Sequence, residues 1–281
     1  MWLRKELLDA PLDFQCLRAG HSDVGPAYCE PWSVPNCNVV SSLRRGMAEG
    51  EFKGPDERYV RRPGEVSLIP SGRLRRSAVL SPEGMSCGWL HFRYVFMGGH
   101  EFLKFFAVPL AFRGAAAEFL DGVQRRLADL CQRGDTMDFA ELAAVKVEGF
   151  KMLEAILAES PPREGAEATL EDLRRLDEAL RHLRERFCEP LDIGVLARRA
   201  HMSRTQFHVR FQRALGMSPM QYVRSLRVDK AKQLLLTTTL PVGEVAATVG
   251  YDDQLHFSRV FRSAAGASPT DYRERRGTVV P

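Results

Sequence analysis

One pattern occurs twice in this chain, in "FQRALGMSPMQYV" (211–223) and in "FRSAAGASPTDYR" (261–273). Both copies contain an initial Phe and then G-x-S-P-x-x-Y, at an offset of 50 residues. Upstream of each copy, "IGVLA" (193–197) corresponds to "VGEVA" (242–246). The repeat predicts two helical units of one plan, each a short helix, a turn and a second helix.

The chemistry of the repeated G-x-S-P segment is that of a helix that stops and restarts. A glycine just past a helix end accepts positive φ, a serine caps the next helix, and a proline suits the first helical position. A polar side chain at the third helical position can bond back to the cap. The residues in these roles are Gly216 and Gly266, Ser218 and Ser268, Pro219 and Pro269, and Gln221 and Asp271.

A single long helix is predicted between the two units, in "SPMQYVRSLRVDKAKQLLL" (218–236). Such a rigid connector would hold the two second helices at a fixed separation. Helices that read one face of B-DNA must lie roughly 34 Å apart. One chain with both units could therefore insert a helix into each of two successive major grooves.

Residues 177–276 resemble the DNA-binding domain of the AraC/XylS family of bacterial transcription regulators. The motifs that carry the resemblance are "LARRAHMSRTQFHVRFQRALGMSPMQYVRSLRVDKAKQLL" and "VGEVAATVGYDDQLHFSRVFRSAAGASPTDYRERR". The resemblance implies a sequence-specific regulator whose partner is promoter DNA, with RNA polymerase as a second partner if it is an activator. The operator sequence and the sign of regulation stay open.

Base-reading positions follow from the resemblance and from the spacing of the aromatic residues. Phe257 and Phe261 are four residues apart and predict a buried side for the second helix of the second unit. Arginine pairs with guanine and glutamine with adenine, whereas Val209, where many members have Arg or another polar residue, could touch a thymine methyl. The base-reading residues expected are Thr205, His208, Val209, Gln254, Leu255, His256, Ser258 and Arg259.

Positive charge is concentrated in the C-terminal part of the chain. Residues 170–281 contain 19 Lys and Arg against 13 Asp and Glu, although the whole chain has a net charge of only +4. Contacts to DNA phosphates add salt-dependent affinity without reading sequence. The residues expected to make them are Arg210, Arg224, Arg227, Lys230, Lys232 and Arg262.

The first part of the chain has a different character, which predicts a two-domain α+β fold. Short β-prone runs at 38–46, 64–72 and 87–96 favour a β-sandwich or barrel, and amphipathic helices follow at 117–133 and 139–158. On the first of these helices Phe119, Val123, Leu127 and Leu130 form the predicted apolar stripe. We expect a domain at 1–160, a linker at 161–170 and a DNA-binding domain at 171–281. Most of the linker lies in "ESPPREGAEAT" (159–169), whose prolines and glycine are typical of a linker.

The turn phrases "RRPGEVSLIPSGRLRR" (61–76) and "WLHFRYVF" (89–96) resemble the cupin-like sensory domain found ahead of this DNA-binding module. Arg73 and Arg75 stand near the positions where metal cupins have histidines, so no metal, cofactor or enzymatic activity is expected. The interior of such a barrel could hold a small effector, with a sugar as the expected class, because Trp stacks on sugar rings and Arg bonds hydroxyls. The effector-binding candidates are Trp32, Arg75, Trp89, His91 and Arg93.

Several alternatives stay open at this point. The two helices at 117–133 and 139–158 could cover the sheet or join two copies into a homodimer. The sensory domain could respond to a partner protein, or the chain could be a cupin enzyme with a DNA-binding tail; an alkylation-repair fusion would need a cysteine cluster that the six scattered cysteines do not provide. The start, "MWLRKELLDAPLDF", lacks a signal peptide and no apolar run suits a membrane helix, so a cytoplasmic protein is expected.

Overall fold

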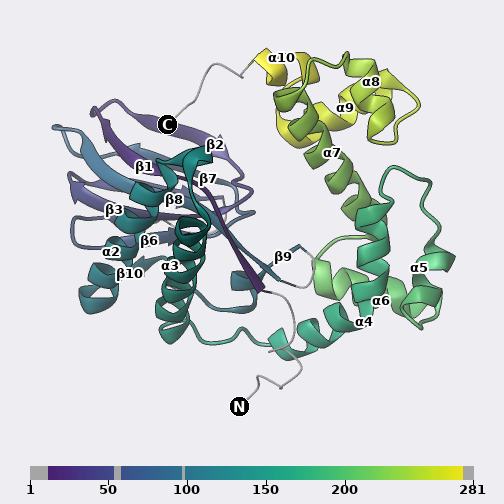
Figure 1. Cartoon of the computed structure of the whole chain (residues 1–281), viewed down its shortest axis with the longest axis horizontal. Coiled ribbons are helices and arrows are strands. Elements are labelled where there is room, and N and C mark those ends of the chain that lie inside the picture. Colours follow the sequence, from purple (N-terminus) through teal and green to yellow (C-terminus); the bar gives the residue numbers. More distant parts are fainter. Residues whose placement is uncertain (1–11, 54–57, 97–98, 275–281) are drawn as a thin grey trace. The chain divides into compact units, whose positions relative to one another are not determined.

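The computed structural model describes residues 12–53, 58–96 and 99–274, and the chain divides into two compact units after Ala166. The first unit contains antiparallel sheets followed by helices, and the second is helical, as the sequence predicts (Figure 1). Residues 1–11, which belong to the stretch used for the signal-peptide argument, lie outside the described residues, as do residues 275 and 276 of the second motif. Within the described part of the chain, no helix has the length and apolar character needed to cross a membrane.

Two antiparallel sheets make up the first unit. In the first sheet the strands run in the order β1-β8-β3-β6-β10, with β9 beside β8, and in the second the order is β2-β7-β4-β5. The strands of the first sheet are β1 (Leu12–Val24), β3 (Asn38–Arg45), β6 (Val66–Ile69), β8 (Met85–Phe96), β9 (His100–Glu101) and β10 (Ala111–Phe112). Those of the second are β2 (Cys29–Ser33), β4 (Ala48–Phe52), β5 (Arg58–Arg61) and β7 (Arg75–Val79).

The alternation along β8 separates the two faces of the first sheet. Leu90, Phe92 and Tyr94 are fully buried and belong to the main apolar core, whereas Trp89 and His91 lie on the opposite face and are only partly buried. The core lies between this sheet and the helices α2 (Gly114–Cys131) and α3 (Phe139–Ala158), which run beside it in Figure 1. Short 3-10 turns, η1 (Phe102–Phe105) and η2 (Gly134–Thr136), precede these helices.

The apolar stripe predicted for α2 is wrong at one position. Phe119 is exposed, and Leu120 occupies the core beside Val123 and Leu127. The physical reason is that the sheet meets α2 one residue further round the helix, so Ala117, Leu120 and Gln124 join the buried side. Gln124 is buried there because its amide bonds Ser42 and the backbone of Trp89.

The second unit repeats its architecture. Its helices are α4 (Ala166–Glu185), α5 (Ile193–Arg199), α6 (Arg204–Leu215), α7 (Pro219–Thr237), α8 (Val242–Thr248), α9 (Gln254–Ala265) and α10 (Pro269–Glu274). Gly216 and Gly266 end α6 and α9 with φ of 69° and 71°, as predicted for left-handed caps. Ser218 and Gln221 form the predicted reciprocal capping bonds, and Ser268 and Asp271 form the same pair before α10.

The expected linker at 161–170 needs correction. Residues 161–163 form backbone hydrogen bonds with 105–107 of the first unit, and α4 already begins at Ala166. Ala166 and Leu170, which we expected in the linker, are buried, because the apolar side of α4 extends to its first turn. The composition of this stretch predicts a flexible linker, but the backbone of residues 161–163 is hydrogen-bonded to the first unit.

A close approach of α3 to the first sheet gives a test of this packing. A Cβ added to Gly149 would lie 2.1 to 2.5 Å from atoms of the Phe14 ring, and the Tyr94 hydroxyl donates a 2.5 Å hydrogen bond to the carbonyl of Gly149. We expect Gly149→Ala to lower the free energy of unfolding by about 2 kcal/mol in a urea titration, because the ring must be displaced from a filled core.

The matched control is Gly122→Ala on α2. An added Cβ there meets only the flexible end of Arg126 at 3.3 Å, so the change should be neutral or should stabilise by up to about 1 kcal/mol through helix propensity. Equal behaviour of the two variants would show that α3 does not pack against Phe14.

Candidate DNA-binding surface and effector pocket

Helix α9 is held by a buried aromatic pair that leaves its other side exposed. Phe257 and Phe261 are fully buried with ring centroids 5.6 Å apart, and Tyr272 contacts Phe261 edge-on at 5.4 Å. The Asp253 carboxylate caps the helix by accepting hydrogen bonds from the backbone N–H groups of residues 255 and 256. Four of the predicted base-reading residues are exposed and one, Ser258, is half-buried; the exposed four are Gln254, Leu255, His256 and Arg259.

Helix α6 has the same construction. Phe207 and Phe211 are fully buried with centroids 5.4 Å apart, and Tyr222 contacts Phe211 edge-on at 5.7 Å. Ser203 and Gln206 form the reciprocal cap at its start. All three predicted base-reading residues of this helix, Thr205, His208 and Val209, are exposed.

A buried carboxylate fixes α6 to α4, and the sequence analysis missed it. Asp172 is fully buried and accepts hydrogen bonds from Arg210, at 2.6 Å, and from Arg213. Burial alone would raise the pKa of Asp172, but the guanidinium groups of Arg213 and Arg210 outweigh it and lower that pKa below its usual value. The predicted phosphate role of Arg210 is therefore corrected to a structural one, because Asp172 holds its guanidinium together with that of Arg213. The only sequence signal for this contact was Asp172 itself, an acidic residue on the otherwise apolar side of a helix.

Arg227 is the second correction among the predicted phosphate contacts. Its guanidinium donates hydrogen bonds to the carbonyl oxygens of Phe187 at 2.7 Å, Gly250 at 2.7 Å and Glu189 at 3.0 Å. It also lies over the Tyr251 ring, 5.3 Å from the centroid. Arg227 thus binds the loop before α5 to the turn before α9, since these carbonyls at helix ends have no partner within their own helices.

The remaining predicted phosphate residues differ in whether their charged groups have partners within the described residues. Arg224 and Arg262 are exposed and form no ion pair within the described residues. Lys230 donates to the side chain of Gln233, and Lys232 lies 3.6 Å from Asp229. Arg224 and Arg262 therefore have the freest guanidinium groups of this set.

The two helix-turn-helix pairs lie at opposite ends of α7 (Figure 1). At ~1.5 Å per residue, the 19 residues of α7 span about 28 Å, close to one turn of B-DNA at roughly 34 Å. Gly250 packs so closely on the loop before α5 that an added Cβ would lie 2.3 Å from the carbonyl oxygen of Cys188. Arg227 and this contact tie the two pairs together, so their spacing does not depend on α7 alone.

Three of the predicted effector residues come together between the sheets of the first unit. The rings of Trp89 and His91 lie 5.3 Å apart, and the buried Arg75 forms a two-bond ion pair with Glu30, at 2.7 and 3.0 Å. Burial lowers the pKa of His91, and the charges of Arg18 and Arg75 lower it further against the opposing effect of Glu30. Arg93 lies on the same face of β8, but its Nε donates to the backbone carbonyl of residue 36 at 2.8 Å.

Trp32 does not belong to this group. Its side chain is 43% exposed and lies under the guanidinium of Arg76, at 5.2 Å from the ring centroid. Arg76 follows the inward-facing Arg75 on β7 and so points to the outer face of the second sheet. The expected role of Trp32 in the pocket is therefore corrected.

The space between the sheets also holds polar residues that the sequence analysis did not select. Arg61 on β5 is 6% exposed, and its guanidinium donates hydrogen bonds to Ser41 on the first sheet and Ser77 on the second. Tyr59 lies two residues away, and its buried hydroxyl has no hydrogen-bond partner among the residues that the structure describes. Tyr59 and Arg61 are two residues apart and therefore lie on one face of a strand, which was the available signal. The "RRPG" turn concealed it, because the first residue of that turn, Arg61, is the last residue of β5.

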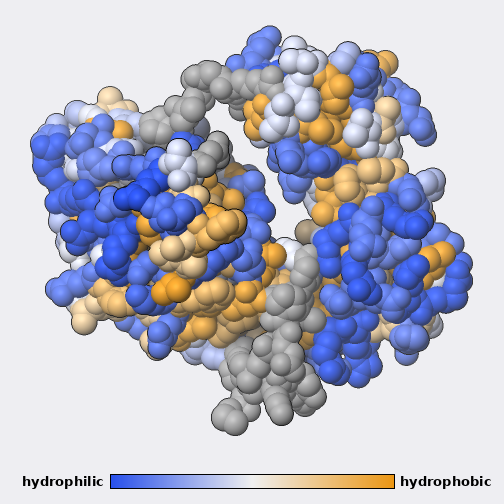
Figure 2. Space-filling view, viewed as in Figure 1, coloured by the Kyte–Doolittle hydropathy of each residue, from blue (hydrophilic) through white to orange (hydrophobic). Residues whose placement is uncertain are grey.

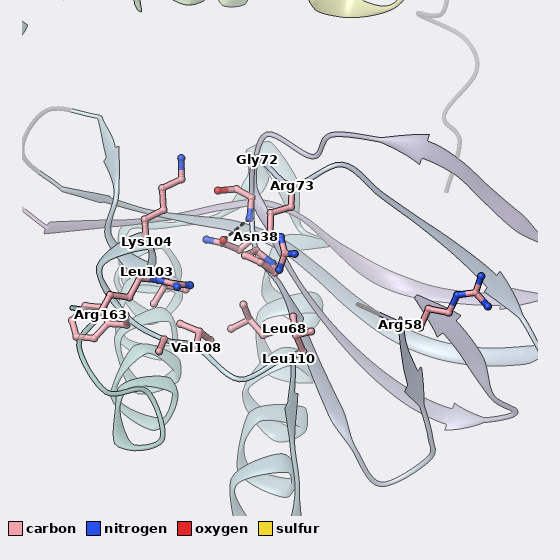
Figure 3. A pocket seen from close by; sticks show the side chains of 14 residues that line it. Asn38, Arg58, Leu68, Gly72, Arg73, Leu103, Lys104, Val108, Leu110 and Arg163 are labelled. Carbon is pink, nitrogen blue, oxygen red and sulfur yellow. Dashed lines mark hydrogen bonds between the residues drawn. The ribbon is translucent and has the colours of Figure 1, made fainter. Parts of the chain in front are cut away.

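A separate cleft of about 840 Å³ lies in the first unit, and none of the predicted effector residues lines it. Figure 3 shows Lys104 and Arg163 on one side of it and Asn38 and Arg73 on the other, above apolar residues such as Leu68. Arg73 lies 4.0 Å above the Phe52 ring, and burial lowers its pKa, with the nearby charge of Arg163 adding to the effect. The cleft is thus a second concave feature with positively charged walls.

Comparison with known proteins connects this arrangement to a family. A family model described as a helix-turn-helix domain matches residues 196–275, which covers both helix-turn-helix pairs. The arabinose operon regulatory protein of Escherichia coli (strain K12) is 29% identical over 236 residues, which are 80% of this chain and 77% of that protein. The transcriptional activator RhaR of Pectobacterium atrosepticum is 31% identical over 162 residues, 57% of this chain and 55% of its own.

The chain is therefore similar to AraC-type transcription regulators, as the sequence motifs predict. Among solved structures, ToxT from Vibrio cholerae O395 bound to (E)-4-(8-methylnaphthalen-1-yl)but-3-enoic acid matches with a TM-score of 0.57 at 12% identity, over 93% of this chain and 98% of that one. This likeness concerns the fold alone, and it covers both units.

The chain is a DNA-binding transcription regulator of the AraC type. The matched relatives are named as regulators of transcription and not as enzymes. In the part of the chain that the structure describes, no group of three or more His, Cys, Asp or Glu side chains could hold a metal ion.

The corrected role of Arg227 can be tested against the role that the sequence predicts. We expect Arg227→Met to lower the free energy of unfolding of the second unit by about 2 kcal/mol, because three backbone carbonyls lose a charged donor. The measurement is a urea titration in which circular dichroism reports the loss of helix.

The matched control is Arg224→Met, three residues earlier on the same helix and exposed. It should leave stability unchanged and reduce the salt dependence of DNA binding by about one phosphate contact. If Arg227→Met behaved like this control, Arg227 would be a phosphate contact after all.

Proposed function

We propose that this regulator reads promoter DNA with α6 and α9 in two successive major grooves, under the control of a small effector held between the two sheets. The observation that carries the proposal is the matched construction of α6 and α9. Each has a buried Phe pair and an exposed opposite side, and Arg227 links the two pairs of helices. Helices held in this way present their exposed sides at a fixed separation.

Within this proposal, base reading is assigned to the exposed sides of both helices. Arg259 has no ion pair within the described residues, so its guanidinium is available for the O6 and N7 atoms of a guanine. The side-chain oxygen of Gln254 lies beside Gly243 of α8, where it would be 2.7 Å from a Cβ added to that glycine. Val209 is 61% exposed and Leu255 is 68% exposed, which suits contacts with thymine methyl groups.

Effector control is supported by the polar lining of the space between the sheets. Arg75, Glu30, Trp89 and His91 offer charge, hydrogen bonding and a ring face in one place. One relative is named for the arabinose operon, and ToxT has been solved with an organic acid bound. A sugar is therefore the class of effector to test first by calorimetric titration, and a pull-down tests the alternative of a partner protein.

A homodimer through α3 is supported by an exposed apolar stripe. Phe139, Leu142, Val147 and Phe150 are exposed along this helix, and Phe139 is 91% exposed. Figure 2 shows apolar residues gathered on the part of the surface where α2 and α3 lie in Figure 1. Patches of this kind mark interaction sites, and an identical stripe on a second copy would match this one. Contact with RNA polymerase would follow if the regulator is an activator.

The base-reading assignment is tested by selecting bound DNA from a random pool and then changing Arg259. We expect Arg259→Ala to weaken binding to the selected site by about 1–3 kcal/mol and to relax the preference at one base pair. Arg262→Ala is the control on the same helix, and it should weaken binding evenly across sequences. An unchanged preference in Arg259→Ala would show that α9 does not read bases through this residue.

The dimer is tested by placing a charge in the stripe. Val147→Glu should shift the sedimentation coefficient at micromolar concentration from that of a dimer to that of a monomer, because a carboxylate would be buried without a partner. Leu80→Glu, at an exposed apolar position between β7 and β8, is the control and should leave the dimer intact. A wild-type monomer with and without DNA would remove the proposal.

A further inference from the structure

The Arg61 side chain is a buried cation without a negative partner among the described residues. It is 6% exposed, and within the described residues it donates hydrogen bonds to the Ser41 hydroxyl at 3.3 Å and the Ser77 hydroxyl at 2.5 Å and to no other group. Its Nε is buried and has no hydrogen-bond partner in that part of the chain. Two neutral hydroxyls therefore bind the guanidinium, and its Nε–H group stays unpaired among the residues that the structure describes.

A guanidinium in this position is unfavourable unless an anion joins it. Arginine side chains keep their positive charge in proteins, so the cost of burying one is offset only by partners. A buried charge without a partner costs several kcal/mol in general. Arg75 faces the same space but is neutralised by both carboxylate oxygens of Glu30. The buried Arg61 and Arg75 and the partly buried Glu30 together therefore leave one net positive charge.

We infer that the effector of this regulator is a sugar acid whose carboxylate binds Arg61. This inference rests on the proposed effector site between the sheets and names the class of ligand that it takes. A single carboxylate matches the one uncompensated charge, whereas a phosphate dianion would exceed it beside Glu30. The Nε–H of Arg61, which has no partner within the described residues, could donate to one oxygen of a carboxylate while a terminal N–H donates to the other.

The surrounding groups fit the rest of a polyhydroxylated ring. Burial raises the pKa of Tyr59, so its unpaired hydroxyl keeps its proton and can donate to a ligand oxygen. Glu30 can accept hydrogen bonds from ligand hydroxyls, and the Trp89 ring offers a face on which a sugar can stack. Trp89 and His91 are only partly buried although they face the second sheet, so their rings are accessible in part.

Arg61 also links the two sheets directly. Ser41 lies on β3 of the first sheet and Ser77 on β7 of the second, and both bond the same guanidinium. A carboxylate that binds Arg61 competes with these hydroxyls. Binding of the effector would therefore change how the two sheets are held together, and such a difference between two states is what ligand control requires.

The test is thermal unfolding of the full-length protein with paired compounds. The probes are sodium D-galacturonate, D-glucuronate and D-gluconate against D-galactose and D-glucose, with sodium chloride to match ionic strength. We expect at least one acid to raise the melting temperature of the wild type more than its neutral parent does. Arg61→Met should weaken binding of that acid by at least about tenfold in calorimetry, because the charged donor is lost.

The same variant without ligand separates a binding residue from a structural one. Arg61→Met should melt at or above the wild-type temperature, since an uncompensated buried charge is replaced by an apolar chain of similar length. Arg58→Met, on the same strand with a side chain that is 63% exposed, is the matched control and should bind the acids as the wild type does.

Four outcomes would count against the proposals in different ways. Failure of every acid to stabilise the wild type would overturn the inference, as would a ligand-free Arg61→Met that melts well below it. Equal binding of neutral sugars to wild type and Arg61→Met would overturn the acid class and leave effector control intact. An acid that binds through Arg61 without changing DNA affinity would support the site and contradict the proposed control.

Discussion

The DNA-binding unit depends on one packing constraint, the burial of two phenylalanines four residues apart in each recognition helix. Phe207 and Phe211, and Phe257 and Phe261, are fully buried, and each pair is completed by a tyrosine from the helix that follows the G-x-S-P segment. Because both rings of a pair lie on one side of a helix, the opposite side must face outward. The exposed faces of α6 and α9 are the consequence of this burial.

The first unit divides its sheet faces by polarity. One face of the first sheet packs with α2 and α3 and carries the large apolar core, in which Phe14, Leu90 and Tyr94 are fully buried. The other face meets the second sheet through smaller apolar clusters interrupted by serines and arginines. Since the helices already supply much of the hydrophobic stabilisation, the space between the sheets can keep polar groups that would weaken a purely structural core.

Arginine in this chain has two separate uses that residue type alone does not distinguish. Arg210 and Arg227 are held by Asp172 and by backbone carbonyls, so they fix the helices that present the DNA-binding surface. Arg224, Arg259 and Arg262 are exposed and form no ion pair within the described residues. The positively charged residues of the second unit thus include some that fix its helices, so a count of residues does not give the number of side chains free to contact DNA.

The sequence by itself determined the local structure, because capping, helix stops and the period of apolar residues depend on near neighbours. The caps at Ser203 and Ser218, the left-handed glycines, the strands β3, β6 and β8 and the bounds of α3 follow from such signals. Tertiary structure alone decided which charged groups meet. Asp172 with Arg210, Arg227 with Gly250, and Arg61 between Ser41 and Ser77 join residues 16 to 38 positions apart. Their energies depend on burial and on distance in space, which no local pattern of residues contains.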